Sequence, residues 1–145
     1  NWMFPAAAKL LALNPLSAQW MARQAARPGV VKKLLEGTGS HIGAHGMDLY
    51  ARLIRQPSHV RGVLAMMAAW DLGGLGRQMP GLRGPVFLHL GGRDTTVPTS
   101  WSGRTYIVLP QARGITVPEL GHLAHEEAPE QVARQIGAWA QERRS

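Results

Sequence analysis

Two short apolar runs in the second half of the chain, residues 85–90 and 114–118, constrain its fold more than any other feature. Each run is shorter than a typical helix, and Gly84 and Gly91 bound the first of them. Continuous apolar runs of this length are typical of strands buried on both faces of a parallel sheet. We therefore predict an α/β fold whose second half runs strand, loop, helix, strand, loop, helix.

The first half of the chain has the apolar periodicity of helices separated by short breaks. Pro28, Gly37 and Ser58 stand where a first helical turn, a C-terminal stop and an N-cap are expected. The predicted helices cover about 6–13, 16–26, 28–36, 49–54 and 58–67, and a last helix covers 129–143. A glycine-rich loop is predicted over 71–76, and residues 106–109 have the propensity of a strand.

The composition is that of a folded domain. Of 145 residues, 45% are hydrophobic and 17% are charged, no cysteine is present, and the formal net charge is +7. The lack of cysteine excludes disulfides and thiol catalysis, and it fits a cytoplasmic protein. A basic surface favours anionic partners, but the basic residues are scattered, so we expect no nucleic-acid binding and leave peripheral association with a membrane open. No apolar run is long enough to predict a membrane-spanning helix.

Two polar loops follow the predicted strands and carry the candidate chemistry. Asp94 lies in the loop after the first strand and His122 in the loop after the second, 28 residues later. The carboxyl ends of parallel strands meet at one edge of the sheet, where ligands bind in such folds. A neutral imidazole can take a proton from a hydroxyl nucleophile, and a buried carboxylate orients that imidazole. We predict that Asp94 and His122 are the acid and the base of a catalytic triad, in contact at roughly 2.6–3.2 Å.

The nucleophile of such a triad is not evident in this chain. No serine lies in a Gly-x-Ser-x-Gly motif, and Ser40 has its glycines at the wrong offsets. We expect the nucleophile, the oxyanion hole and most of the sheet upstream of Asn1, so that this chain by itself is inactive. His41 and His45 have the spacing of metal ligands on a helix, but Gly43 and Gly46 favour a loop there, and we predict neither a metal nor a cofactor.

A methionine-rich stretch precedes the glycine-rich segment. Met66, Met67 and Trp70 are candidate substrate-binding residues, because methionine adapts to irregular apolar ligands. The same stripe fits a helix core equally simply, and core is the commoner role.

The chain resembles one family over nearly its whole length. Residues 85–143 resemble the closing part of α/β-hydrolases, through the Gly-Gly-Arg-Asp motif that ends at Asp94 and the Gly-His motif that ends at His122, followed by Glu127 and Pro129. Residues 49–53, 57–72 and 122–127 resemble the magnesium-chelatase accessory proteins of bacteriochlorophyll synthesis, which are α/β-hydrolase-like. The resemblance implies a helical cap over 1–78 and the C-terminal part of the hydrolase core, its last two strands and flanking helices, over 79–145. It also implies that 106–109 end a helix.

Three functions remain open on the sequence. The resemblance implies an accessory role in magnesium chelation, with a porphyrin or the magnesium-chelatase subunits as partners. A generic α/β-hydrolase acting on an ester or a related small molecule is the first alternative, and a basic, non-catalytic binding domain is the second.

Overall fold

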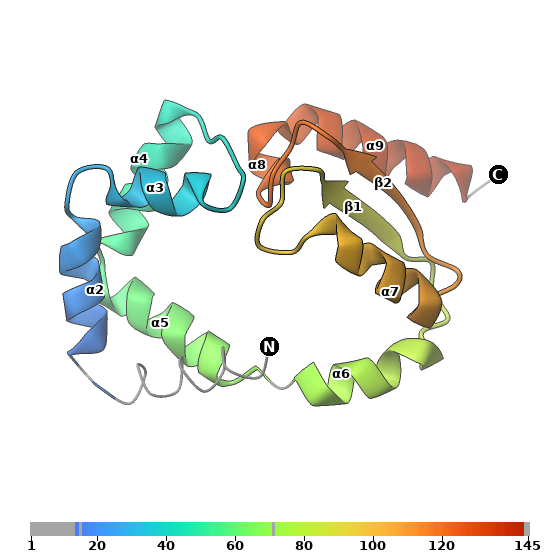
Figure 1. Cartoon of the computed structure of the whole chain (residues 1–145), viewed down its shortest axis with the longest axis horizontal. Coiled ribbons are helices and arrows are strands. Elements are labelled where there is room, and N and C mark those ends of the chain that lie inside the picture. The colour runs from blue at the N-terminus through green and yellow to red at the C-terminus, as the bar shows by residue number, and fades with distance from the viewer. Residues whose placement is uncertain (1–13, 15, 71, 144–145) are drawn as a thin grey trace. The chain divides into compact units, whose positions relative to one another are not determined.

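The computed structural model describes residues 14, 16–70 and 72–143, which form two compact units (Figure 1). Unit 1 comprises residues 1–33 and 44–74, and unit 2 comprises residues 34–43 and 75–145. The chain therefore enters unit 2 for a short stretch, returns to unit 1, and enters unit 2 again. The boundary that we predicted at residues 78 and 79 concerns the parts of a larger hydrolase fold and stays a prediction.

Unit 1 is built from helices. They are α2 (Ser17–Ala25), the start of α3 (Val30–Glu36), α4 (Ala44–Ile54), α5 (Pro57–Ala68) and the start of α6 (Leu72–Gln78). Its core lies between α2 and α5, where Ala18 and Ala22 face Val60 and Leu64 and Met21 packs at the edge. The small alanine side chains on α2 allow α5 to approach closely. The four helices predicted between residues 16 and 67 are confirmed, whereas the one predicted over 6–13 lies outside the described residues.

Several predicted helix boundaries are wrong. Helix α3 begins at Val30, so Pro28 lies in the preceding turn, in which Gly29 has φ +76°. Helix α5 begins with Pro57, whose fixed φ suits the first helical position, so Ser58 is not the N-cap.

Two segments predicted as loops are helical. Residues 72–76 of the glycine-rich segment form most of α6, and α4 begins at Ala44 and includes Gly46. Glycine lowers helix stability by only about 1 kcal/mol per residue, which neighbouring helix-forming residues offset.

Unit 2 contains the two predicted strands, β1 (Phe87–Gly91) and β2 (Arg113–Val117). They pair in parallel, with Phe87 opposite Arg113 and Gly91 opposite Val117. The crossover between them contains η2 (Thr99–Trp101) and α7 (Ser102–Val108), so residues 106–108 belong to a helix. The strands are preceded by η1 (Met79–Gly81) and followed by α8 (Ala124–Glu127) and α9 (Pro129–Glu142). The α/β class of the prediction is confirmed.

A second core lies where β2 meets α8 and α9. Its buried members are Val117, Leu120, Ala124 and Val132. The strands themselves are only half-buried to exposed, apart from their last residues, so the prediction of burial on both faces is wrong for this chain. Within the described residues the sheet has two strands, and each is therefore an edge strand with less cover than a central one.

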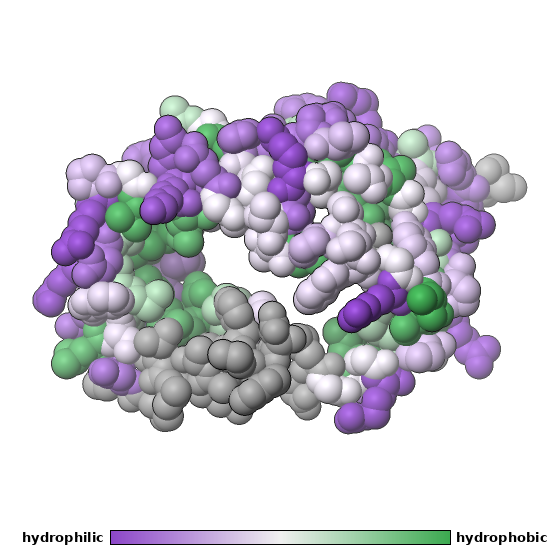
Figure 2. Space-filling model, viewed as in Figure 1, coloured by the Kyte–Doolittle hydropathy of each residue, from purple (hydrophilic) through white to green (hydrophobic). Residues whose placement is uncertain are grey.

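Apolar side chains also reach the surface among polar ones, as Figure 2 shows. Among the described residues, no helix has both the length and the apolar character needed to cross a bilayer.

Candidate functional site

Asp94 stands at the carboxyl end of β1 in a tightly bonded loop. The Asp94 N–H donates to the Gly91 carbonyl at 3.2 Å, and the Arg93 N–H donates to the Leu120 carbonyl at 2.8 Å. The second bond joins the loop after β1 to the loop after β2. One backbone hydrogen bond therefore links the two strand-end loops directly.

The carboxylate of Asp94 has a partner for each oxygen. Oδ1 accepts the N–H groups of Thr96 and Val97, both at 2.8 Å, and Oδ2 lies 2.9 Å from Nδ1 of His122. The side chain is 11% exposed. Burial raises the pKa of Asp94, but the hydrogen bonds from the Val97 N–H, from His122 and from the Thr96 N–H outweigh it, so the pKa lies below its ordinary value of 3.8. The group is ionised at neutral pH.

His122 follows β2 and turns its ring toward Asp94. Its backbone N–H donates to the Thr38 carbonyl at 3.3 Å, and its side chain is 36% exposed. With Nδ1 donating to Asp94, Nε2 is the nitrogen that can accept a proton in the neutral ring. The predicted contact between Asp94 and His122 is confirmed, and its geometry suits a general base. That the pair is catalytic stays a prediction.

A third segment, the turn of residues 37–41, closes this site and was not expected from the sequence. The Thr95 hydroxyl donates to the Gly37 carbonyl at 2.7 Å, and the Thr38 carbonyl accepts the backbone N–H groups of both Thr95 and His122. The turn therefore touches both strand-end loops. The Gly37–Thr95 bond spans 58 residues of the chain, and local sequence patterns do not report such pairings.

Glycine makes this close approach feasible. Gly39 has φ +80°, and a Cβ there would lie 1.7 Å from the Arg93 carbonyl oxygen. A Cβ on Gly121 would lie 2.4 Å from the Gly39 carbonyl. Both distances are far below van der Waals contact, so the three backbones can meet only without side chains at these positions.

Ser40 is fully buried and cannot be the missing nucleophile. Its hydroxyl oxygen accepts the Leu123 N–H at 2.8 Å, and its hydroxyl hydrogen-bonds the carboxylate of Glu127. A hydroxyl committed to two partners in the protein interior is not available to a substrate.

Glu127 is the second feature that the sequence did not reveal, beyond its place in the family resemblance. Its side chain is 4% exposed. Oε1 accepts the Gly121 N–H at 2.6 Å, and Oε2 accepts the His41 N–H at 3.0 Å and Nη2 of Arg93 at 3.2 Å. Burial raises the pKa of Glu127, but these hydrogen bonds, that of Ser40 and the Arg93 charge outweigh it, so the pKa lies below its ordinary value of 4.5.

The two histidines that have metal-ligand spacing fall in different units. His41 lies in the turn of residues 37–41 of unit 2, and His45 lies in α4 of unit 1. Within the described parts of the chain, no group of three acidic, histidine or cysteine side chains could hold a metal ion.

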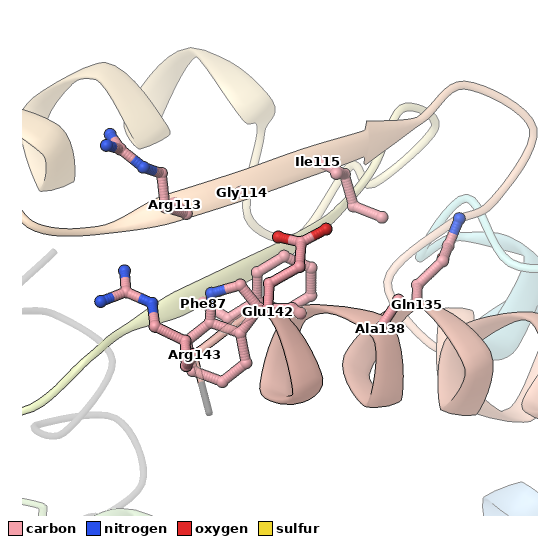
Figure 3. Close-up of a pocket in the computed structure, with 9 residues that line it drawn as sticks. Phe87, Arg113, Gly114, Ile115, Gln135, Ala138, Glu142 and Arg143 are labelled. Atoms are coloured by element: carbon pink, nitrogen blue, oxygen red, sulfur yellow. The ribbon is translucent and has the colours of Figure 1, made fainter. Parts of the chain in front are cut away.

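A hollow of about 760 Å³ lies at the other end of the strands (Figure 3). Phe87 and Arg113, the first residues of β1 and β2, line it together with residues of α9. Trp139 stacks on Phe87 with their ring centroids 5.1 Å apart, and its Nε1 is buried without a hydrogen-bond partner among the described residues. Because it lies away from the carboxyl ends of the strands, this hollow is separate from Asp94 and His122.

Comparison with known proteins identifies a relative. No family model matches the chain. A protein of Rhodobacter capsulatus named magnesium-chelatase 30 kDa subunit is 39% identical over 137 residues, which is 94% of this chain. The chain is related to a magnesium-chelatase subunit. The match must include both units, because it leaves out only a few residues, and the chain spans about half (48%) of the length of that relative.

The candidate substrate-binding residues lie in unit 1, whereas Asp94 and His122 lie in unit 2. Met66 is 52% exposed and Trp70 is 47% exposed, and Met67 is half-buried. The core role that we considered the commoner one is therefore wrong for Met66 and Trp70. Their role in binding stays a prediction.

Proposed function

We propose that the protein assists magnesium insertion into the porphyrin of bacteriochlorophyll synthesis, as an α/β-hydrolase-like accessory protein of the chelatase. The observation that carries the proposal is the 39% identity, over 94% of the chain, with a protein named as a magnesium-chelatase subunit. The hydrolase-like part of the proposal is supported by the sequence motifs around Asp94 and His122 and by the helices of unit 1.

In this proposal the chain is the C-terminal half of a hydrolase fold. Residues 1–78 supply the cap, and residues 79–145 supply the last strands and helices of the core. Three observations support it: the parallel pair of strands, the acid and the histidine at their carboxyl ends, and the length of the relative, about twice that of the chain. The nucleophile then belongs to the preceding half, on a strand that continues the sheet beyond β1.

The Asp94–His122 pair gives the proposed site its chemistry. Nε2 of His122 takes the proton of a hydroxyl as that oxygen attacks, and the imidazolium that forms donates through Nδ1 to Asp94. Because the Asp94 carboxylate is held by two backbone N–H groups, it stays ionised and in place while the ring charges.

The exposed apolar side chains of unit 1 suit a flat apolar ligand. Met66 and Trp70 offer a polarisable and an aromatic surface, on which a porphyrin ring can stack. Arg55 and Arg61, both exposed in the same unit, are cations able to pair with the carboxylate arms of a porphyrin. Contacts with the chelatase subunits are the other proposed means of assistance.

Deletion of the gene in a phototrophic host tests the proposal. We expect protoporphyrin to accumulate and bacteriochlorophyll to fall, and the wild-type gene to restore both. His122→Ala and Asp94→Asn should fail to restore pigment if the pair is used, and Trp70→Ala should restore it only partly. His125→Ala, which changes a neighbouring exposed histidine, is the matched control and should restore it fully.

The Asp94–His122 contact by itself also favours the second function, a generic hydrolase acting on an ester. The same deletion strain separates the two. Unchanged pigment together with the loss of an esterase activity would refute the accessory role and support the generic hydrolase.

A further inference from the structure

The carboxylate of Glu127 collects donors from three separate segments of unit 2. Ser40 and His41 belong to the turn of residues 37–41, Arg93 to the loop after β1, and Gly121 to the loop after β2. The short helix α8 returns the chain so that Glu127 faces Gly121, only six residues before it.

Two of these donors immediately precede the members of the candidate pair. Arg93 is the residue before Asp94, and Gly121 is the residue before His122. Their hydrogen bonds to Glu127 measure 3.2 and 2.6 Å. The carboxylate therefore acts on the backbone that carries His122 directly, and on the loop that carries Asp94 through an arginine side chain.

The donor set requires a charged acceptor at this position. Two backbone N–H groups, a hydroxyl and a guanidinium converge on one side chain that is 4% exposed. A carboxylate has only acceptor sites and can serve all four, whereas an amide would place an NH2 group against at least one of the N–H donors. A buried charge of this kind is stable because every lone pair has a partner.

We propose that Glu127 is a positioning residue, whose carboxylate holds the two strand-end loops and the turn of residues 37–41 at the spacing at which His122 Nδ1 donates to Asp94. Glu127 acts through its hydrogen-bond partners, which are His41, Arg93, Gly121 and Ser40. The proposal goes beyond the function proposed above, because it concerns the geometry of the pair in the resting protein, whatever the pair does.

Nuclear magnetic resonance of ¹⁵N-histidine-labelled protein tests this role. In the wild type, His122 should show an Nδ1-protonated tautomer with a downfield Nδ1–H signal that is protected from exchange. Glu127→Gln should lose that signal and give a mixture of tautomers, whereas Glu127→Asp, which keeps the charge, should recover part of it. Glu126→Gln, on the exposed neighbouring glutamate, is the matched control and should leave the signal unchanged.

Circular dichroism of each variant separates positioning from folding. A folded Glu127→Gln protein with the wild-type His122 signal would overturn the proposal. If Glu127→Gln does not fold, Arg93→Gln provides the measurement, because the Arg93 side chain is 42% exposed and its loss removes only the link to the Asp94 loop. That variant should weaken the His122 signal, and an unchanged signal would overturn the proposal equally. The two proposals can fail independently. If the His122 signal is normal in all variants while the deletion strain still loses pigment, the positioning role of Glu127 is refuted and the proposed function stands.

Discussion

At the scale of single residues, order and spacing along the chain were enough to find the pair but not its support. Asp94 and His122 were predicted because each follows a recognisable strand, and parallel strands bring their ends together. Ser40 and Glu127 were missed because their partners are remote: the Ser40 hydroxyl meets Leu123 across 83 residues, and the His41 N–H meets Glu127 across 86. The only local signal was a glutamate six residues after Gly121, which fits an ordinary helix start equally well.

Acid should destabilise unit 2 through Asp94 and Glu127. Despite their burial, hydrogen-bond donors hold both pKa values in the folded protein below the ordinary 3.8 and 4.5. The unfolded chain therefore takes up these protons at higher pH than the folded chain does. Both groups stabilise the fold fully above about pH 5, and that contribution is lost as the pH falls from there through the folded pKa values.

Urea denaturation from pH 7 to pH 3 measures this effect. Glu127→Gln should lower the free energy of unfolding at pH 7 by about 2 kcal/mol. The same variant should reduce the acid slope, which is the rate at which the unfolding free energy falls as the pH is lowered. Glu130→Gln, on an exposed side chain, should keep the wild-type slope. If the unfolding free energy falls equally steeply with acid in both variants, Glu127 does not contribute to the acid sensitivity.

At the scale of elements, apolar periodicity predicted the helices correctly. The helix boundaries inferred from glycine and proline were wrong in several places. Segment 71–76 was predicted as a loop because it holds three glycines, yet α6 includes them. The turn of residues 37–41 shows the opposite case, in which Gly39 is required by φ +80° and by the adjacent Arg93 carbonyl. Sequence alone does not separate a tolerated glycine from a required one, because the difference depends on a contact with a remote segment.

Three alanine substitutions test this distinction. Gly39→Ala should cost at least about 3 kcal/mol of unfolding free energy, because it adds a steric overlap to an unfavourable φ. Gly29→Ala meets only the unfavourable φ of +76° in open space and should cost about 1–2 kcal/mol. Gly43→Ala, with neither constraint, should stay within about 0.5 kcal/mol of wild type in chemical denaturation. Equal losses at Gly39 and Gly29 would show that the overlap is relieved without cost.

At the scale of the whole molecule, the chain forms two units with separate cores. The first half contributes residues 34–43 to the second unit, which no shift in composition marks. The outline of the second unit was predictable because its strands and last helix have local sequence patterns. The contribution of residues 34–43 to this unit was not predictable, because it depends on contacts with remote segments.

The separate cores should respond separately to mutation. Leu64→Ala removes a buried side chain from the core between α2 and α5, and we expect a loss of about 2–4 kcal/mol there. Hydrogen exchange should then quicken in α2 and α5 but not in β1 and β2, and Val132→Ala should give the reverse pattern. Exchange that quickens equally throughout after either change would show a single cooperative unit.

The separation of 86 residues between His41 and Glu127 also determines how late the site can form during synthesis. A ribosome that adds roughly 5–20 residues per second makes Glu127 about 4–17 s after His41. For the first part of that interval neither strand-end loop has been made, and the carboxylate of Glu127 is added after both loops. The helices of unit 1 can pack while the nascent chain grows, whereas the site around His122 is completed only after Glu127 has been added.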